Sequence, residues 1–417
     1  MDFMQNEADV ELASLSRKIL TDQLTPDRLR AAEASGEEFD AALWADLAAA
    51  GVLSAALPES VGGAGLGLLA QCAVLTELGR EVAPLPYLAS IVLGASALAR
   101  FGTPGQQERW AAPAARGEVI LTAALAEEDG DDPRVPSATA ERVAGGEGWT
   151  LSGVKTTVFA ARLAGLMLVP ATTTMGVTVF LVDPCDTGVT VQRQQVTGGT
   201  MGRVVLDRVR VDGDRVLGGP ADGHQIAAWL ADRATVGLCA VQFGVAARCL
   251  EMTSAYAQSR VQFGKPIGGF QAVAQRLADA YIDTEAIRLT MWQAAWRLAA
   301  GLPCDSEVAT AKFWAADAGH RVAHTAVHVH GGVGIDMDYP LHRYFVAAKR
   351  CEFALGGATA QLRRIGAALA AGGLVGFPGP TRHGRAAGLR NTSFRSPPPV
   401  RPGYGYLDVP RSASRWW

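Results

Sequence analysis

The residues best suited to chemistry lie in residues 256–271, where the chain reads Y-A-Q-S-R-V-Q-F-G-K-P-I-G-G-F-Q. Arg260 carries a planar fork of donors that fits phosphate oxygens, and Phe263 carries a ring face that suits a flat base. Gly264 and Pro266 are predicted to end the helix that comes before them, and a second helix follows. For an isolated R-x-Q-F-G, an ordinary turn between two helices with an exposed arginine would be the better interpretation.

A second candidate segment, residues 328–341, reads H-V-H-G-G-V-G-I-D-M-D-Y-P-L. Its glycines allow a backbone to approach a ligand closely. The run Gly331–Gly334 follows a helical pattern, whereas the dinucleotide fingerprint of a Rossmann unit needs a strand before it and a helix after it. This segment is therefore a ligand contact of a different kind. Asp336 and Asp338 offer carboxylates, but we expect them to cap or solvate the turn before Pro340.

Three histidines, His320, His324 and His328, recur at four-residue spacing and fall on one face of a predicted helix. Two histidines at this spacing can bind zinc, but the H-E-x-x-H pattern is absent and no acidic third ligand is in register. Packing, or a ligand contact made by His328, is the better interpretation. We predict no metal site.

Together the two segments, about seventy residues apart, resemble the acyl-CoA dehydrogenase family, in the order that this family shows. The resemblance covers about residues 40–370. It implies FAD as the cofactor, with the R-x-x-F-G run gripping the FAD of a neighbouring subunit and the G-G-x-G run contacting the same molecule. The cofactor-binding residues that the resemblance implies are Arg260, Gln262, Phe263, Phe270, Gln271, His328, Gly331, Gly332, Thr359 and Gln361.

The catalytic base expected of such an enzyme is missing. Acyl-CoA dehydrogenation needs a carboxylate to remove the α proton, and donors that polarise the thioester carbonyl. In most members of the resembled family the base is a glutamate just before the last core helix, where this chain has Gly357. Other members place it on an earlier helix, at the position of Ala234, and Asp232 lies nearby but out of register. No catalytic residue is assigned.

Two further segments depart from the family pattern. The loop 125–132 reads L-A-E-E-D-G-D-D, and its acidic residues are expected to form an exposed loop rather than a cation site. The segment 155–159, which lies against the flavin ring in the family, ends in Phe159 in place of a hydroxyl group. The chain therefore resembles the actinobacterial type in which two unlike subunits form a hetero-oligomer in steroid side-chain degradation. In that type one subunit supplies the base and the other completes the FAD sites.

These residues must be positioned by a mainly α fold with a central β domain. Residues 1–120 are predicted to be helical, residues 121–215 a small antiparallel β barrel, and residues 222–370 a bundle of long helices. Apolar spacing predicts helices at 43–50, 69–78 and 88–101, and β-rich runs predict strands at 149–153, 177–182, 189–192 and 204–211. The glycine-rich segment 58–67 has no strand before it, so a turn between helices is expected.

Charge separates the last residues from the rest. Residues 371–417 hold seven arginines, no lysine and one aspartate, a charge of +6, so the net charge of −3 leaves −9 for the remainder. Proline and glycine are frequent there, and no apolar period appears, so we expect a disordered cationic tail. The acidic remainder does not suggest a nucleic-acid partner.

Cysteine use and the N-terminus indicate a cytoplasmic protein. The six cysteines are scattered singly, which favours buried, reduced thiols. The first residues show neither a signal peptide nor a transit peptide. No apolar run is expected to be long enough for a membrane span.

The leading hypothesis is an FAD-dependent acyl-CoA dehydrogenase, forming an α,β-unsaturated thioester from an acyl-CoA and passing electrons to an electron-transferring flavoprotein. It would act as a homo- or hetero-oligomer with a sister acyl-CoA dehydrogenase subunit. Two alternatives stay open: a catalytically inactive subunit that completes the partner's FAD site, or a flavoenzyme of the same fold with a different reaction.

Overall fold

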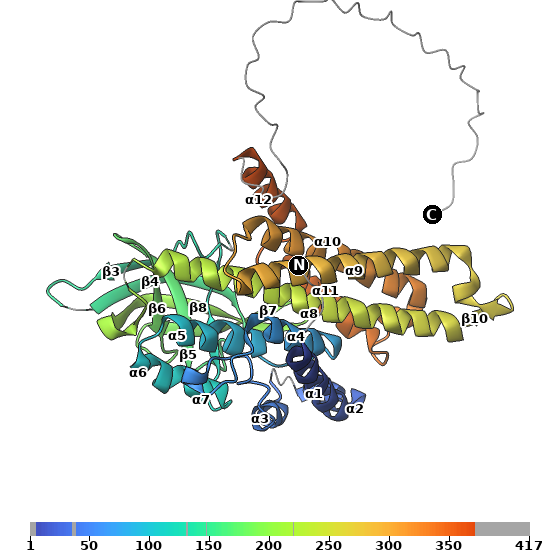
Figure 1. Cartoon of the computed structure of the whole chain (residues 1–417), viewed down its shortest axis with the longest axis horizontal. Helices are drawn as coiled ribbons and strands as arrows, with labels where there is room; N and C mark the ends of the chain where they lie inside the picture. Colours follow the sequence, from blue (N-terminus) through green and yellow to red (C-terminus); the bar gives the residue numbers. More distant parts are fainter. Residues whose placement is uncertain (1–5, 36–38, 131, 147, 220, 372–417) are drawn as a thin grey trace, which may run out of the picture. The chain divides into compact units, whose positions relative to one another are not determined.

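The chain folds as helices, then a β-sheet, then longer helices (Figure 1). The computed structural model describes residues 6–35, 39–130, 132–146, 148–219 and 221–371, so the predicted cationic tail lies, apart from Ala371, outside the described residues. The predicted fold class, mainly α with a central sheet, is confirmed.

Two of the N-terminal helices begin at polar caps formed by Asn6 and Asp40. The side chain of Asn6 accepts the N–H of Asp9 at 2.7 Å, and the side chain of Asp40 accepts the N–H of Leu43 at 2.9 Å, which satisfies donors that a helix start leaves open. The helices are α1 Glu7–Gln23, α2 Pro26–Ser35, α3 Ala41–Ala49, α4 Gly67–Arg80, π-helix η2 Leu88–Ala95, α5 Ser96–Phe101, α6 Pro104–Gln106, π-helix η3 Gln107–Ala111 and α7 Ala112–Ala115, with a single 3-10 turn, η1 Glu59–Val61, in the glycine-rich segment. The predicted helices and the predicted turn are confirmed, although Leu88–Ala95 winds as a π-helix.

The central sheet contains nine strands in the order β7-β8-β4-β3-β5-β6-β9, with β1 added beside β5 and β2 beside β4. Its strands are β1 Leu121–Ala123, β2 Ala126–Glu127, β3 Thr139–Arg142, β4 Gly148–Val158, β5 Leu166–Thr173, β6 Gly176–Val182, β7 Val189–Val196, β8 Gly199–Asp212 and β9 Val216–Leu217, the last two joined by the 3-10 turn η4 Gly213–Arg215. The four predicted strands lie within β4, β6, β7 and β8.

The prediction of a purely antiparallel barrel was wrong in this detail. Strands β1 and β3 pair with β5 in parallel. Strand β3 lies between β4 and β5 in the sheet. It pairs with β4 in antiparallel fashion, and the chain then crosses from β4 to the other side of β3, where β5 runs in the same direction as β3. No pairing between β7 and β9 closes the sheet among the described residues.

Three long C-terminal helices, α8 Gly223–Ser259, α9 Gln271–Ala299 and α10 Asp305–His330, pack side by side (Figure 1). Two shorter helices follow, α11 Leu341–Phe353 and α12 Ala358–Ala370, and both contact α10. Helix α8 contains an 18-residue window with a mean hydropathy of 1.2, so the prediction that no segment reaches the apolar length of a membrane span needs correction. Of that window, 56% is buried, because α8 packs as a core helix against α4, α9 and α10.

Helices α4 and α8 cross at very short range. A Cβ added to Gly79 would stand 2.2 Å from the carbonyl oxygen of Val241, and one added to Gly244 would stand 2.0 Å from that of Thr76. Both positions therefore need glycine for steric reasons, whatever their backbone angles. The apolar core runs without a break from the N-terminal helices through this crossing into α9, α10 and α11.

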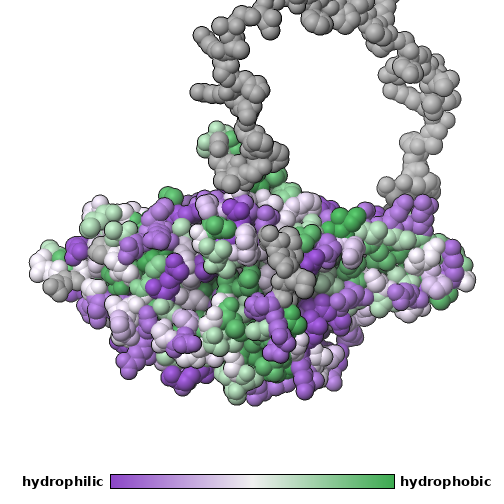
Figure 2. Space-filling model, viewed as in Figure 1, coloured by the Kyte–Doolittle hydropathy of each residue, from purple (hydrophilic) through white to green (hydrophobic). Residues whose placement is uncertain are grey.

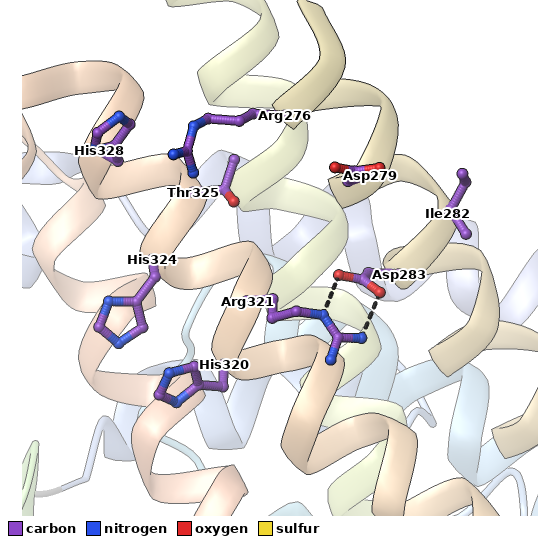
Figure 3. Close-up of a pocket in the computed structure, with 9 residues that line it drawn as sticks. All are labelled: Arg276, Asp279, Ile282, Asp283, His320, Arg321, His324, Thr325 and His328. Atoms are coloured by element: carbon purple, nitrogen blue, oxygen red, sulfur yellow. Dashed lines mark hydrogen bonds and ion pairs between the residues drawn. The ribbon is translucent and has the colours of Figure 1, made fainter. Parts of the chain in front are cut away.

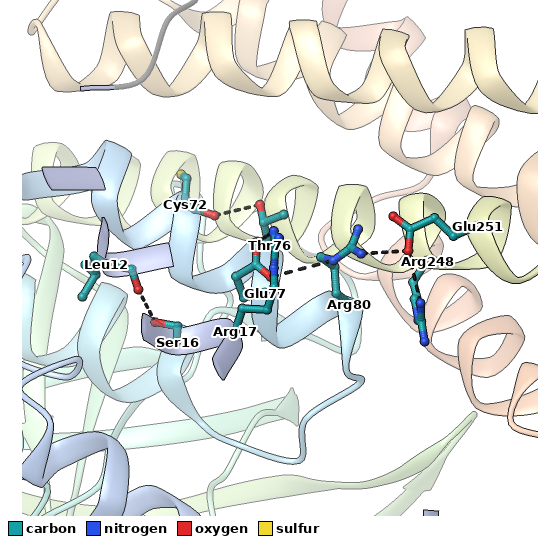
Figure 4. A network of polar contacts seen from close by, with 9 residues as sticks. All are labelled: Leu12, Ser16, Arg17, Cys72, Thr76, Glu77, Arg80, Arg248 and Glu251. Atoms are coloured by element: carbon teal, nitrogen blue, oxygen red, sulfur yellow. Dashed lines mark hydrogen bonds and ion pairs between the residues drawn. The ribbon is translucent and has the colours of Figure 1, made fainter. Parts of the chain in front are cut away.

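Beside the crossing, charged side chains join α1, α4 and α8 (Figure 4). The guanidinium of Arg17 donates two hydrogen bonds of 2.7 Å to the buried carboxylate of Glu77. Arg80 then reaches Glu251 on α8 at 2.8 Å, and Arg248 reaches the same carboxylate at 3.2 Å. This network joins α1 to α4 and α4 to α8.

Candidate functional site

A tight hairpin carries the R-x-Q-F-G run between α8 and α9. Its strands, β10 Val261–Gln262 and β11 Lys265–Pro266, pair in antiparallel fashion around the two-residue turn Phe263-Gly264. Both turn residues have positive φ, +52° and +79°, as a type I′ hairpin turn requires. The prediction that Gly264 and Pro266 end the preceding helix was wrong, because α8 already ends at Ser259 and these residues form the hairpin.

The hairpin turns Phe263 outward. Its left-handed backbone conformation is strained for a non-glycine residue, at about 1–3 kcal/mol. The phenyl ring is 92% exposed, and only its edge meets Phe270, at a centroid distance of 6.1 Å. The ammonium group of Lys265 lies 4.6 Å from the centre of the Phe270 ring. An aromatic face held open in this way is available to a ligand.

Arg260 stands at the base of the hairpin with a free side chain. Its backbone N–H donates to the carbonyl of Tyr256 at 2.8 Å, and its carbonyl accepts the N–H of Ile267 at 2.8 Å. Its guanidinium is exposed and has no acidic partner among the residues that the structure describes. A cation fixed at its backbone and unpaired at its side chain suits an anion supplied by another molecule. Gln262 and Gln271 are exposed beside it.

The glycine run follows the end of α10, as the sequence predicted. Gly331 ends the helix with φ +62° and ψ −137°, a conformation that strongly favours glycine. The 3-10 turn η6 then covers Gly331–Ile335. A Cβ added to Gly331 or Gly332 would meet no atom within 4 Å, so this backbone is open to a ligand. His328 is exposed one turn before it.

A residue that sequence analysis passed over, His330, joins the two segments. Its buried ring stacks on Tyr256 from α8, with centroids 4.3 Å apart and planes inclined by 24°. Its Nδ1 lies 2.8 Å from the carbonyl oxygen of Ala326, and its Nε2 lies 3.1 Å from the hydroxyl of Tyr339. The structure thus brings together the ends of α8 and α10, which carry the two predicted segments.

A depression of about 690 Å³ lies between α9 and α10, next to His328 (Figure 3). Its lining residues are Arg276, Asp279, Ile282, Asp283, His320, Arg321, His324, Thr325 and His328. Two of the lining residues, Arg321 and Asp283, form a two-pronged ion pair with distances of 2.8 Å and 2.6 Å. The apolar side chains of Tyr281 and Ile282 are exposed on α9, and Figure 2 shows apolar surface at this end of the bundle.

Two histidines of this depression, His320 and His324, lie close to charged groups. Lys349 places its Nζ 2.5 Å from Nδ1 of His320 and 2.9 Å from Glu352. The same Nδ1 also lies 3.2 Å and 3.1 Å from the two carboxylate oxygens of Glu352. Burial, followed by the charge of Lys349, lowers the pKa of His324. Among the described residues no three His, Cys, Asp or Glu side chains are grouped to hold a metal ion.

The segment that would carry the base is held by two buried side chains. The fully buried Lys312 donates to the carbonyls of Cys351 and Glu352, at 2.7 Å and 3.1 Å. Gln361 is also fully buried and donates to the carbonyls of Leu355 and Gly356, at 3.2 Å and 3.1 Å. What the structure shows for Gln361 is therefore support of this loop, while Thr359 is exposed.

Neither familiar base position has a carboxylate, and lack of space is not the reason at Gly357. There φ is −75° and ψ is −173°, which any residue adopts, and an added Cβ would meet only the carbonyl oxygen of Glu352 at 3.6 Å. Ala234 is buried in α8. Burial raises the pKa of the nearby Asp232 to about 6, against the opposing charge of Arg134.

The two other aspartates and the acidic loop are arranged differently. Asp336 accepts the N–H of Asp338 at 3.0 Å, so it caps the turn as predicted. The prediction of an exposed loop was wrong for Glu127, which forms a buried ion pair with Lys155 at 2.5 Å across β2 and β4. Phe159 is half-buried, and its carbonyl accepts the hydroxyl of Thr122 at 2.6 Å.

Comparison with known proteins agrees with this geometry. The model of the acyl-CoA dehydrogenase N-terminal domain matches residues 6–118, and that of the C-terminal domain matches residues 221–370. The chain belongs to the acyl-CoA dehydrogenase family. Among curated relatives, acyl-CoA dehydrogenase FadE27 of Mycobacterium tuberculosis is 49% identical over 379 residues, which is 89% of this chain and 99% of that protein. FAD is the cofactor of this acyl-CoA dehydrogenase family.

Two solved structures are similar over nearly the same length. The ChsE4–ChsE5 complex from M. tuberculosis matches with a TM-score of 0.84 and 50% identity, covering 89% of this chain and 99% of the matched one. A variant of the Tcur3481–Tcur3483 steroid acyl-CoA dehydrogenase matches with a TM-score of 0.82 and 42% identity, covering 88% and 98%. Both are complexes of two differently named proteins.

Proposed function

We propose that this chain is one subunit of a hetero-oligomeric, FAD-dependent acyl-CoA dehydrogenase. Its proposed substrates are CoA thioesters in which the acyl group is the side chain of a steroid. The observation that carries the proposal is that exposed residues suited to a cofactor occur together with two base positions that have no carboxylate, and we name the two segments that hold these exposed residues the cofactor edge. The edge is formed by the α8–α9 hairpin and the turn after α10, and the empty positions are Gly357 and Ala234. Both similar complexes contain two different proteins, which supports a sister subunit, and one of them is a steroid acyl-CoA dehydrogenase, which supports the substrate class.

The residues of the edge fit FAD by their chemistry. The unpaired guanidinium of Arg260 suits the pyrophosphate, the exposed ring of Phe263 suits the flat adenine, and the open backbone at Gly331 and Gly332 allows close contact. The other proposed contacts are Gln262, Phe270, Gln271, His328 and Thr359, while the predicted contact of Gln361 is not proposed, because its side chain is fully buried and supports the loop at Leu355 and Gly356. When bound, FAD accepts the β hydrogen as hydride. We place these contacts on the FAD that lies mainly in the sister subunit.

The chain's own flavin pocket fits less well. The half-buried Phe159 replaces a hydroxyl donor, and the non-glycine residues Thr157 and Ala160 beside it have positive φ, +48° and +55°. Gly357 supplies no base, although its backbone N–H is available to polarise a thioester carbonyl. A catalytically inactive subunit that completes the partner's FAD site is therefore the second candidate function. For both candidate functions we propose that the assembled complex passes electrons to an electron-transferring flavoprotein. We also propose that the complex is located in the cytoplasm.

The decisive experiment is dye-coupled turnover of a steroid acyl-CoA. It compares the isolated chain, the chain co-purified with a sister subunit, and the complex in which the sister's base glutamate is changed to glutamine. We expect no ordinary turnover by the isolated chain, since loss of a general base costs about 10²–10⁴ in rate. Full turnover by the isolated chain would refute the hetero-oligomer, and turnover that survives the sister's substitution would place the base on this chain, at Asp232 or Asp338.

Cofactor binding is tested separately. Arg260→Ala should weaken FAD retention by the complex, because a lost charge-assisted contact is worth about 1.5–3 kcal/mol. Arg208→Ala is the matched control, since Arg208 is an exposed arginine in β8 with only a long 3.7 Å contact to Asp207. Equal retention by both variants, or no flavin in any preparation of the complex, would contradict the assignment of this edge to FAD.

A further inference from the structure

We infer that His330 is a positioning residue, whose neutral ring, stacked on Tyr256 and hydrogen-bonded to Tyr339, holds the hairpin of Arg260 and the turn of Gly331 as one rigid cofactor edge. The inference rests on the proposed function, in which both segments contact one FAD. It goes beyond that function by assigning the alignment of the two segments to a residue that does not contact the cofactor itself.

The α8 side of the link acts through Tyr256. This residue is in the last turn of α8, and its carbonyl accepts the N–H of Arg260, so the ring and the helix cap belong to the same residue. The ring lies on His330 at 4.3 Å. Any shift of the α10 end therefore reaches the cap of α8, and with it the guanidinium of Arg260, through one aromatic contact.

On the α10 side, the link depends on the position of His330 directly before the glycine turn. His330 is the last residue of α10, directly before Gly331. A Cβ added to Gly334 would stand 3.1 Å from the Cβ of His330, so the returning turn η6 packs on the same residue. Tyr339, which follows η6, completes the enclosure with its ring centre 5.2 Å from that of His330.

The hydrogen bonds fix the proton on one nitrogen. The carbonyl of Ala326 can only accept, so Nδ1 of His330 carries the hydrogen and donates to it. In the neutral ring Nε2 then accepts a hydrogen bond from the hydroxyl of Tyr339. Both polar atoms of the buried ring are thus satisfied in the neutral Nδ1–H tautomer, without a buried charge. Burial lowers the pKa of His330, which agrees with a ring that stays neutral.

The titratable and charged groups around the ring are few. Tyr256 comes from α8 and Tyr339 from the segment after η6, and the charge of Arg248 on α8 acts on Tyr339. No carboxylate contacts the ring among the described residues. Acid therefore has a definite effect: burial keeps the folded ring neutral at its ordinary pKa of 6.5, and the link weakens only when the pH falls through the lower pKa of the folded ring, below 6.5.

The test measures the dissociation constant of FAD for the complex with a sister subunit, by titrating the apo-complex with FAD and following flavin fluorescence from pH 5.5 to 8. His330→Gln and Tyr339→Phe are the test variants, His224→Gln on the exposed start of α8 is the matched control, and Arg260→Ala reports on the proposed function. At pH 7.5 we expect a dissociation constant about tenfold higher for each test variant, the effect of one lost buried hydrogen bond. For His330→Gln we also expect a flat pH profile below 6.5, where the unmodified complex weakens.

The outcomes are separable. Amide hydrogen exchange in residues 260–267 should quicken in both test variants and stay unchanged in the control. If Arg260→Ala weakens FAD binding while both test variants bind FAD normally, or while His330→Gln keeps the unmodified pH profile, the positioning role is refuted and the proposed function stands. If Arg260→Ala also binds normally, the proposed function fails. Should His330→Gln not fold, Tyr339→Phe decides alone, because it removes only one hydroxyl group.

Discussion

Replacing Lys155 by methionine should destabilise the sheet strongly. Its side chain is fully buried, that of Glu127 is 6% exposed, and the two atoms Nζ and Oε1 lie 2.5 Å apart. The same carboxylate accepts the backbone N–H groups of Ser137 and Ala138. Methionine keeps the length of the lysine chain but leaves a buried carboxylate without its cation, which costs about 3–5 kcal/mol of the free energy of unfolding.

A second variant separates the charge from the packing. In Glu127→Gln/Lys155→Met no charge is buried, but the amide oxygen replaces only one of the two carboxylate oxygens that accept the backbone N–H groups, so we expect part of the lost stability to return. Arg203→Met is the control, because Arg203 pairs with Glu128 at 2.8 Å in a far more exposed setting. An exposed pair of this kind contributes about 0–1 kcal/mol.

Acid should reduce the difference between Lys155→Met and the unmodified chain. Interaction with Lys155 and the two backbone N–H groups lowers the pKa of Glu127 below its usual 4.5, against the effect of burial. A carboxyl group with a lowered folded-state pKa stabilises the fold above the unfolded value and loses that contribution as the pH falls through the folded value. Urea unfolding followed by circular dichroism at pH 7 and at pH 4 measures both effects. A loss below about 1 kcal/mol at pH 7, or a double variant no more stable than the single one, would refute the reasoning.

Four other perturbations have definite expected results. Gly357→Ala should leave the thermal midpoint equal or slightly higher, by about 0.4–1 kcal/mol of stability, because its backbone suits alanine; a clear drop would contradict this. Asp232→Asn should be more stable than the unmodified chain at pH 8, by at most about 3 kcal/mol, and by roughly half as much at pH 5, because burial raises the pKa of Asp232 from 3.8 to about 6 and the penalty of the charged form fades as the pH falls toward 3.8; equal shifts at both pH values would count against it. Glu77→Gln should cost about 1.5–3 kcal/mol by breaking the two-pronged pair with Arg17, which thermal melting would show and an unchanged midpoint would disprove. Deleting residues 375–417 should leave the midpoint little changed, whereas a large fall would show that the segment packs on the core.

The sequence predicted best what depends on local pattern. Helices α3 and α4 and strands β4, β6, β7 and β8 follow apolar spacing and turn residues that can be read directly. Strand β5 was missed because it is buried along nearly its whole length, so its residues 166–173 do not alternate, and Pro170 argues against a strand. Strands as short as β10 and β11 have no period at all.

The candidate site was predicted in its parts but not in its connections. The sequence identified His328 as the polar residue before the glycine run, yet the buried histidine is His330, two residues later. Its role depends on Tyr256, which is 74 positions away and meets it only in the folded chain. Glu127 was placed in a solvated loop for the same reason, because its partner Lys155 is reached by pairing of β2 with β4.

The glycine crossing of α4 and α8 has a mechanical consequence. With backbones in contact at Gly79 and Gly244, the two helices cannot slide past each other without a steric clash. Helix α8 is one uninterrupted rod of 37 residues, about 55 Å long, that contacts β6 near its start and carries the Arg260 hairpin at its end. A small tilt of α8 at the crossing would displace the hairpin at its far end. The contact with α4 therefore fixes the position of a cofactor edge that lies far from α4 in the sequence.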